Sequence, residues 1–259
     1  MNILVANDDG IHRRGIQELV VALSLIEGAN IYVFAPDKER TAAGHGITIR
    51  DSLYIEEWDK ADYPGVEAAY SCSGTPADCV KLGLSLLKKK GIKIDLVCAG
   101  INHGSNLGTD VYYSGTIASA MEGLLQGVPA IAFSLCSHEC THFEHFKELV
   151  PEIVKKSFGK IPKDTLLNVN VPDLPKEELA GILVTGMGPK DYIDVYKPMQ
   201  ETDKGIYYEY QSSEVYYPNA GLNWDVGGNQ AGYITIVPIS ISMTRPETLE
   251  TIKAWGIEL

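Results

Sequence analysis

The chain has 259 residues, and its 34 Asp and Glu against 22 Lys and Arg give a formal net charge of −12. Hydrophobic residues make up 45% of the sequence, which is typical of a folded globular protein and excludes a disordered chain. The acidic excess argues against duplex nucleic acid or a membrane as a partner, because both attract proteins with a broad positive field. At this length we expect one α/β domain with an appendage.

The first residues and the cysteines indicate a cytoplasmic protein. The opening MNILVANDDG reads as a strand followed by two acids and lacks the basic start of a signal peptide. No stretch reaches the roughly 18–20 consecutive apolar residues of a membrane span. The five cysteines, an odd number mostly within apolar runs, predict reduced thiols rather than a disulfide framework.

The first third of the chain predicts a strand–helix–strand unit. Residues 2–6 and 30–35 are apolar runs typical of strands, and residues 16–25 carry apolar side chains at helical spacing. This order predicts a right-handed βαβ unit in a largely parallel sheet. Residues 37–50 then form a polar loop, and a less regular strand-and-loop segment extends to about residue 71.

The remainder continues the alternation of helices and strands. Helices are predicted over 76–90, 115–127 and 145–157, and strands over 95–99, 130–135, 166–171, 181–184 and 232–241. Residues 191–225, rich in Tyr, Asn and Gly, predict an extended β-arm or loop that serves as an oligomer contact or a pocket lid. A terminal helix is predicted within 246–259. We therefore expect residues 1–259 to form a single domain with a protruding arm.

The adjacent acids Asp8 and Asp9 are the most informative feature. Within a strand their side chains would point to opposite faces, but at a strand end beside Gly10 the backbone can turn and bring both together. Two close carboxylates repel unless a proton or a cation lies between them. Ligands of open α/β sheets bind at this carboxyl edge, so the pair favours a metal site over a helix cap, which explains only one acid well.

Two further loops leave strands at the same predicted edge. One holds Arg40, Thr41 and His45, and the other holds Asn102 and Asn106. Carboxylate, hydroxyl and amide oxygens suit Mg²⁺, Mn²⁺ or Ca²⁺ better than zinc. A site with so few protein ligands leaves positions open for water and for a phosphate oxygen, as phosphoester hydrolysis requires.

Two other segments have both a functional and an ordinary interpretation. Ser114, Gly115 and Thr116 open a predicted helix, where free amides can bind an anion, although Ser114 also suits a simple N-cap. Residues 136–145 contain two cysteines and three histidines, but their spacing matches no common zinc motif. A polar connection is the favoured interpretation there, with a zinc site as the alternative.

Five motifs occur in order across nearly the whole chain: ILVANDDG, APDKERTAAGHGIT, SGTPADCV, AGINHGSNLGTDVYYSGTIASAMEG and WDVGGNQAGYITIVPI. Together they resemble the SurE family of stationary-phase survival proteins, which are metal-dependent 5′/3′-nucleotidases. The resemblance implies a Rossmann-like α/β fold, one divalent cation per subunit and release of phosphate from nucleoside monophosphates. It also implies a homodimer or homotetramer, for which the arm and the residues 246–255 are the candidate contacts.

The resemblance also implies roles for individual residues. The family's metal ligands fall on Asp8, Asp9, Thr41 and Asn102. The family usually has Ser-Gly where this chain has Thr41-Ala42, and commonly has serines at positions 44 and 46, where this chain has glycines. The threonine keeps the hydroxyl, and the glycines remove two donors on the phosphate side.

These observations combine into one hypothesis for the reaction. The four ligands hold one Mg²⁺ or Mn²⁺, Asn106 and the amides of residues 114–116 hold the phosphate, and Asp8 accepts a proton from the attacking water. Asp8 and Asp9 are thus the predicted catalytic residues, and Arg40 or His45 assists the leaving group or offsets charge. The alternative is a nucleotide-binding regulatory protein that uses the same pocket without turnover.

Overall fold

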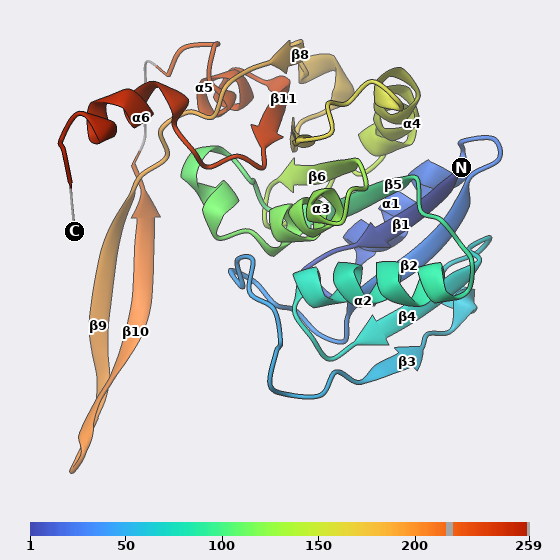
Figure 1. Cartoon of the computed structure of the whole chain (residues 1–259), viewed down its shortest axis with the longest axis horizontal. Coiled ribbons are helices and arrows are strands. Elements are labelled where there is room, and N and C mark those ends of the chain that lie inside the picture. The colour runs from blue at the N-terminus through green and yellow to red at the C-terminus, as the bar shows by residue number, and fades with distance from the viewer. Residues whose placement is uncertain (216–219, 258–259) are drawn as a thin grey trace.

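The computed structural model describes residues 1–215 and 220–257, and a nine-stranded sheet forms its centre (Figure 1). The order of strands across the sheet is β3-β4-β2-β1-β5-β6-β7-β11-β8. Their bounds are β1 (Asn2–Ala6), β2 (Asn30–Pro36), β3 (Ile55–Glu57), β4 (Ala68–Cys72), β5 (Leu96–His103), β6 (Ala130–Cys136), β7 (Thr165–Pro172), β8 (Gly181–Val184) and β11 (Tyr233–Ser240). The predicted fold, a mostly parallel sheet flanked by helices, is confirmed.

The central strands run parallel, and the antiparallel pairs lie toward the edges of the sheet. Strand β1 pairs in parallel with β2 and β5, and β6 pairs in parallel with β5 and β7. Strands β3 and β11 run antiparallel to β4 and β7. The carboxyl ends of β1, β2, β5 and β6 consequently lie along one edge, so the loops that follow these strands are neighbours.

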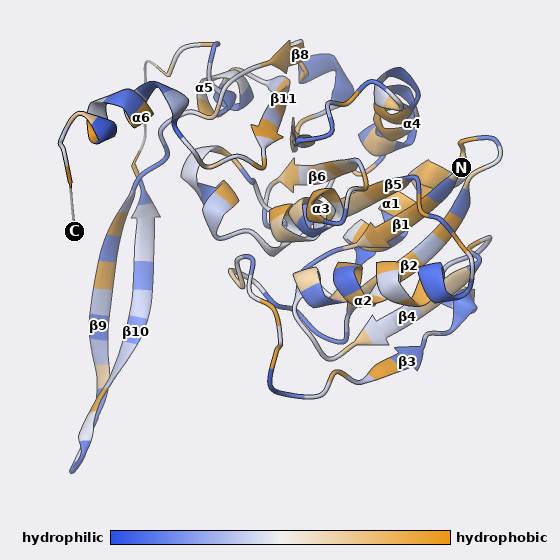
Figure 2. Ribbon diagram, in the orientation of Figure 1, coloured by the Kyte–Doolittle hydropathy of each residue, from blue (hydrophilic) through white to orange (hydrophobic). Residues whose placement is uncertain are grey.

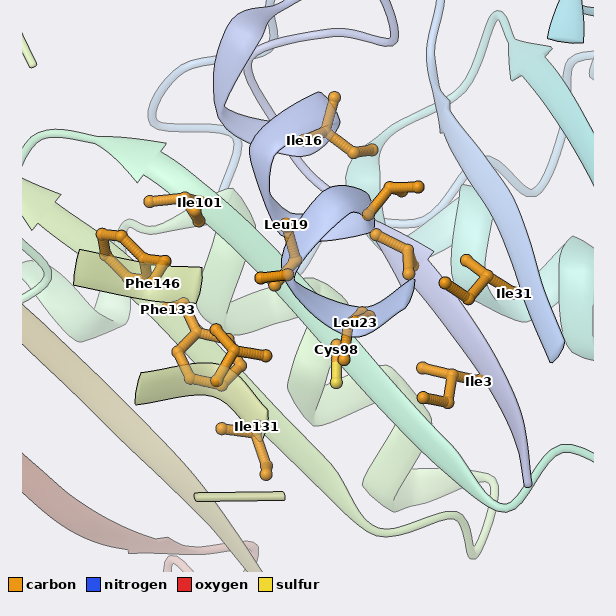
Figure 3. Close-up of a cluster of buried hydrophobic side chains, with 14 of the residues drawn as sticks. Ile3, Ile16, Leu19, Leu23, Ile31, Cys98, Ile101, Ile131, Phe133 and Phe146 are labelled. Atoms are coloured by element: carbon orange, nitrogen blue, oxygen red, sulfur yellow. The ribbon is translucent and has the colours of Figure 1, made fainter. Parts of the chain in front are cut away.

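Both faces of the sheet are buried, which explains why the central strands are continuous apolar runs. In β1, Ile3 and Val5 belong to one apolar cluster, while Leu4 and Ala6 belong to the other. Figure 3 shows the first cluster, in which Phe133 of β6 lies with side chains from β1, β5 and the first helix. The alternation of side chains along a strand therefore supplies both layers of the core.

Helices cover the two faces of the sheet. The helix bounds are α1 (Arg14–Ser24), α2 (Pro76–Lys89), α3 (Gly115–Leu125), α4 (His145–Ser157), α5 (Asp225–Gln230) and α6 (Pro246–Lys253). Helices α1 and α4 contact each other over the first cluster, and α2 and α3 contact each other over the second. Apolar residues concentrate in the central strands and on the helix sides that face them (Figure 2).

A two-stranded hairpin projects from the body of the molecule, and we call it the arm (Figure 1). It consists of β9 (Tyr192–Thr202) and β10 (Gly205–Glu214), which pair antiparallel and are exposed along their whole length. The arm lies within residues 191–225, for which the sequence predicts an extended β-arm or loop. Residues 216–219 of that segment, and residues 258–259 of the predicted terminal tail, lie outside the described residues.

The structure defines elements for which the sequence gives no bounds. Strands β3 and β4 lie in the strand-and-loop segment that ends near residue 71, and α5 follows the arm, where no helix is predicted. All five cysteines are free, as the sequence predicts. Within residues 1–215 and 220–257, no helix combines the length and the apolar character needed to cross a membrane.

Candidate active site

A cavity of 1210 Å³ lies at the carboxyl edge of the sheet and extends to the base of the arm. One wall, which we call the core wall, comes from the loops that follow β1, β2 and β5 and from the start of α3. The other, the arm wall, comes from β9 and β10. The sequence-predicted residues that line the cavity are Asp8, Asp9, Thr41, Asn102, Asn106 and Ser114.

Asp8 and Asp9 follow β1 after one intervening residue and are almost completely buried, with exposed fractions of 6% and 7%. Gly10, at a φ of 107°, allows the turn that ends the strand. The hydroxyl of Thr116 donates to Asp8 Oδ1, and the backbone N–H of His103 donates to Asp9 Oδ2 at 3.2 Å. The ring Nδ1 of His103 lies 3.0 Å from the same oxygen. Both carboxylates are therefore fixed in orientation.

The charge of this pair is unfavourable without a counter-ion. Burial, together with the neighbouring charge of Asp9, raises the pKa of Asp8 to about 6. At neutral pH the Asp8 carboxyl is thus mostly ionised, although it is buried next to the charge of Asp9. A divalent cation relieves that repulsion, so the pair fits a metal site.

Asn102 lies at the end of β5, and Asn106 lies on the loop that follows this strand. The amide nitrogen of Asn102 donates to the Gly104 carbonyl at 2.9 Å, which orients the side chain. Asn106 is 4% exposed, and its backbone N–H donates to Asn170 Oδ1 at 2.8 Å. Its amide nitrogen donates to Ser134 Oγ at 2.8 Å. Among the described residues neither Oδ1 atom has a recorded hydrogen bond, so both amide oxygens can face a ligand.

Thr41 lies on the exposed loop that follows β2. Its hydroxyl donates to Glu39 Oε1 at 2.6 Å, and Arg13 donates to Glu39 Oε2 at 2.6 Å. The backbone N–H of Arg40 donates to the Asp8 carbonyl at 2.8 Å, which ties this loop to the turn after β1. Ala42 adopts a φ of 55°, a backbone conformation that is rare for a residue with a side chain. The loop thus places a hydroxyl at the rim of the cavity.

The first residues of α3 contact Asp8 and hold its side chain in place. Ser114 caps the helix, since its Oγ accepts from the backbone N–H of Ile117 at 3.1 Å. Gly115 packs so closely that a Cβ atom there would lie 2.6 Å from Asp8 Cβ. Thr116 is fully buried and holds Asp8. Of the three residues at the start of α3 that are predicted to bind phosphate, only Ser114 lines the cavity.

Arg40 and His45 do not line the cavity and contact other partners. His45 Nε2 lies 3.0 Å from Glu122 Oε2, on the side of α3 where Lys81 also reaches Glu122 at 2.7 Å. The guanidinium of Arg40 donates to the Ser73 carbonyl at 2.7 Å and to Asp37 at 3.1 Å. In this arrangement both side chains hold the loop in place.

The cysteines and histidines of residues 136–145 have other roles than grouping around an ion. Burial raises the pKa of the Cys136 and Cys140 thiols to about 12, which keeps them protonated. His142 Nδ1 lies 2.8 Å from Asp173. Across residues 1–215 and 220–257, no group of three or more His, Cys, Asp or Glu side chains could hold a metal ion. These contacts fit the interpretation of the segment as a polar connection better than a zinc site.

Several cavity residues have no local signal in the sequence. Lys190 precedes the arm and is 5% exposed, and its Nζ donates to Asp110 at 2.5 Å and to Ser105 at 2.9 Å. Tyr192 OH donates to Asp110 at 2.7 Å, and burial together with this contact raises the pKa of Tyr192 to about 12. His103 follows Asn102 directly, so its position beside a predicted ligand is the one signal that could have indicated it.

Comparisons with known proteins identify the family. Residues 3–194 match the family described as "Survival protein SurE". The chain belongs to the SurE family. This confirms the resemblance seen in the motifs.

SurE relatives match over nearly the whole chain. The protein named 5′-nucleotidase SurE of Synechococcus sp. (strain JA-3-3Ab) is 40% identical over 258 residues, which cover 99% of this chain and 98% of the relative. The protein of the same name from Trichodesmium erythraeum is also 40% identical, over 100% and 98% of the two chains. The crystal structure of the SurE protein from Aquifex aeolicus has a TM-score of 0.82 and 35% identity, covering 99% of this chain and 100% of that one.

Proposed function

We propose that this SurE-family chain is a divalent-metal-dependent nucleotidase that releases phosphate from nucleoside 5′- or 3′-monophosphates. The observation that carries the proposal is the buried pair Asp8 and Asp9, which shares one cavity with the oxygen donors Thr41 and Asn102. The name 5′-nucleotidase of the two relatives supports the substrate class.

The donor set fits one Mg²⁺ or Mn²⁺ per subunit. Asp8, Asp9, Thr41 and Asn102 supply carboxylate, hydroxyl and amide oxygens, which hard cations prefer; Ca²⁺ accepts the same ligands. When bound, such an ion polarises a phosphate oxygen and lowers the pKa of a coordinated water.

The other residues of the core wall act on the substrate and on protons. Asp8, with a pKa of about 6, is suited to accept a proton from the attacking water. Asn106 and Ser114 line the cavity next to the acids and orient the phosphate. The first amides of α3 offer the partial positive charge that favours an anion.

The test is phosphate release from a panel of nucleoside monophosphates with Mg²⁺ or Mn²⁺. Asp8→Asn and Asp9→Asn should each lower kcat by about 10²–10⁴-fold, with an unchanged circular dichroism spectrum. Asp51→Asn, at an exposed loop position away from the cavity, is the matched control. Full activity of the wild-type protein in EDTA would contradict the metal requirement.

A second candidate is a nucleotide-binding regulatory protein. The loop around Thr41 favours it, because Gly44 and Gly46 lack the hydroxyl groups common in the family. Calorimetric binding of a nucleoside monophosphate without any phosphate release, in every metal tested, would support this candidate over the enzyme.

The proposal includes assembly of identical subunits in the cytoplasm. The arm is exposed along both strands, and its apolar side chains Ile193, Val195, Met199 and Ile206 are 47–60% exposed. Exposed apolar surface of this kind is typical of protein contacts. We expect a homodimer or homotetramer, which light scattering on the purified protein measures.

A further inference from the structure

Alternate residues of the arm line the same cavity as Asp8 and Asp9. Tyr192, Asp194 and Tyr196 of β9 lie directly opposite Glu214, Ser212 and Tyr210 of β10, and all six line the cavity. The residues between them do not. Because side chains alternate across a strand, one face of the half of the arm nearest the body is turned toward the site.

Two of the three aromatic rings of this face are held in place through their hydroxyls, and the third, that of Tyr196, lies against one of them. Tyr192 OH donates to Asp110 at 2.7 Å, and Tyr210 OH donates to Asp194 at 2.7 Å. The Tyr196 and Tyr210 rings have centroids 5.4 Å apart. The three tyrosines are nevertheless 37–66% exposed. What they present to a ligand is therefore ring surface, at a low cost in side-chain entropy.

The root of the arm is fastened to the loop that follows β5 and carries Asn106. Lys190 Nζ donates to Ser105 Oγ of that loop at 2.9 Å, and its carbonyl accepts from the Thr109 hydroxyl. Lys190 also contacts Glu214 of β10 at 3.5 Å. The tyrosine face thus has a defined position relative to the core wall.

The size and charge of the cavity define what fits beside the phosphate. Its volume of 1210 Å³ exceeds the ~300–1,000 Å³ of most small-molecule sites, so it has room for much more than a phosphate. Asp194 and Glu214 of the arm wall, with the adjacent Asp110, outnumber Lys190, the cation that pairs with two of them. This side of the cavity therefore repels further phosphate groups but accepts hydrogen bonds from amino groups. A flat, uncharged ring with N–H donors suits this wall.

We propose that the tyrosine face of the arm, centred on Tyr196 and Tyr192, binds the base of a nucleoside monophosphate whose phosphate lies at the core wall. The inference rests on the proposed nucleotidase function and assigns the base-binding half of the same site. Stacking on tyrosine accepts every base, since each has a π-face. The face therefore selects for the presence of a base rather than for its identity.

The test compares adenosine 5′-monophosphate with ribose 5-phosphate, which carries the same ester without a base. Tyr196→Ala should lower kcat/KM for adenosine 5′-monophosphate about tenfold, mainly through KM, and change that for ribose 5-phosphate less than twofold. Tyr207→Ala is the matched control, because Tyr207 lies on the same arm, is 64% exposed and does not line the cavity. It should change neither value.

The ratio of kcat/KM for adenosine 5′-monophosphate to that for ribose 5-phosphate distinguishes an effect on base binding from an effect on oligomer assembly. A loss of oligomers would lower both activities of one variant together, and light scattering would record it. An unchanged ratio in Tyr196→Ala and in the double variant Tyr192→Ala/Tyr196→Ala would overturn the inference.

The outcome also distinguishes this inference from the proposed function. If wild-type protein releases phosphate from neither compound, the nucleotidase proposal fails. Calorimetric titration of both compounds then decides the inference on its own. The inference is supported if wild-type protein binds adenosine 5′-monophosphate more tightly than ribose 5-phosphate and Tyr196→Ala abolishes this difference. Equal binding of the two compounds by wild-type protein overturns it.

Discussion

The core wall and the arm wall of the cavity hold their side chains by different means. Asp8, Asp9 and Asn106 are buried just after the carboxyl ends of strands, and hydrogen bonds with residues of α3, β5 and β7 fix them. Tyr196 and Tyr210 stand on an exposed hairpin. The side chains proposed for chemistry are set by the packing of the whole sheet, whereas those proposed for base binding depend on a few contacts at the root of the arm.

The largest expected effect comes from crowding the core wall. Gly115→Ala places a Cβ 2.6 Å from Asp8 Cβ and 2.9 Å from its Oδ2, so the carboxylate has to move. Misplacement of a reacting group by about 1 Å costs on the order of 10²-fold in rate. We expect that loss in phosphate release. Gly205→Ala is the control on the arm, where a Cβ meets nothing within 4 Å; equal losses in both variants would contradict the contrast between the walls.

Next in size is the effect of releasing the root of the arm. Lys190→Met leaves Asp110 without its buried cation, and breaking such a pair costs about 3 kcal/mol. This change lowers the free energy needed to open the arm locally. Chymotrypsin should therefore cleave within residues 191–215 many times faster. Lys204→Met, at the far turn of the arm, is the control. An unchanged cleavage rate in Lys190→Met would show that other contacts hold the arm.

The smallest expected effect is a dependence of stability on acid, at a carboxylate that belongs to neither wall of the cavity. Hydrogen bonds from Thr141 and His142 outweigh burial and hold the pKa of Asp173 at about 2, below its usual 3.8. Because the folded-state pKa is depressed, its contribution is complete above about pH 4 and disappears as the pH falls toward 2. The shift corresponds to about 2 kcal/mol.

Urea unfolding at pH 6 and pH 2.5 measures this contribution. The free energy of unfolding of wild-type protein should fall more between the two pH values than that of Asp173→Asn. Equal decreases in the two proteins would exclude Asp173 as the source of the acid sensitivity.

The long apolar elements could be predicted because their pattern is local. Strands such as β1 and β6 are buried runs, and α2 begins with Pro76 after the capping residue Thr75. The short helix α5 (DVGGNQ) escaped prediction because two glycines in six residues carry no helical signal. Strand β4 (AAYSC) escaped because it contains no β-branched residue.

In the candidate site, too, some features could be predicted from the sequence and others could not. Asp8 and Asn102 could be placed at one edge because parallel strands end together. The contact of His103 with Asp9 joins residues 94 positions apart, and that of Lys190 with Asp110 joins residues 80 apart. Neither pairing leaves a trace in the local sequence. The period-two pattern of tyrosines in the arm is readable in the sequence, but its orientation toward the cavity depends on the tertiary fold.

The position of β11 has a consequence for synthesis of the chain. This strand begins at Tyr233, after the arm, yet it lies between β7 and β8 in the sheet. Until the ribosome has released β11, the outer edge of β7 has unpaired backbone groups. Such an edge can pair with another chain. The segment TLLNVNVP of β7 is therefore where a chaperone would protect the nascent chain, and where premature termination in the arm would leave a product prone to aggregate.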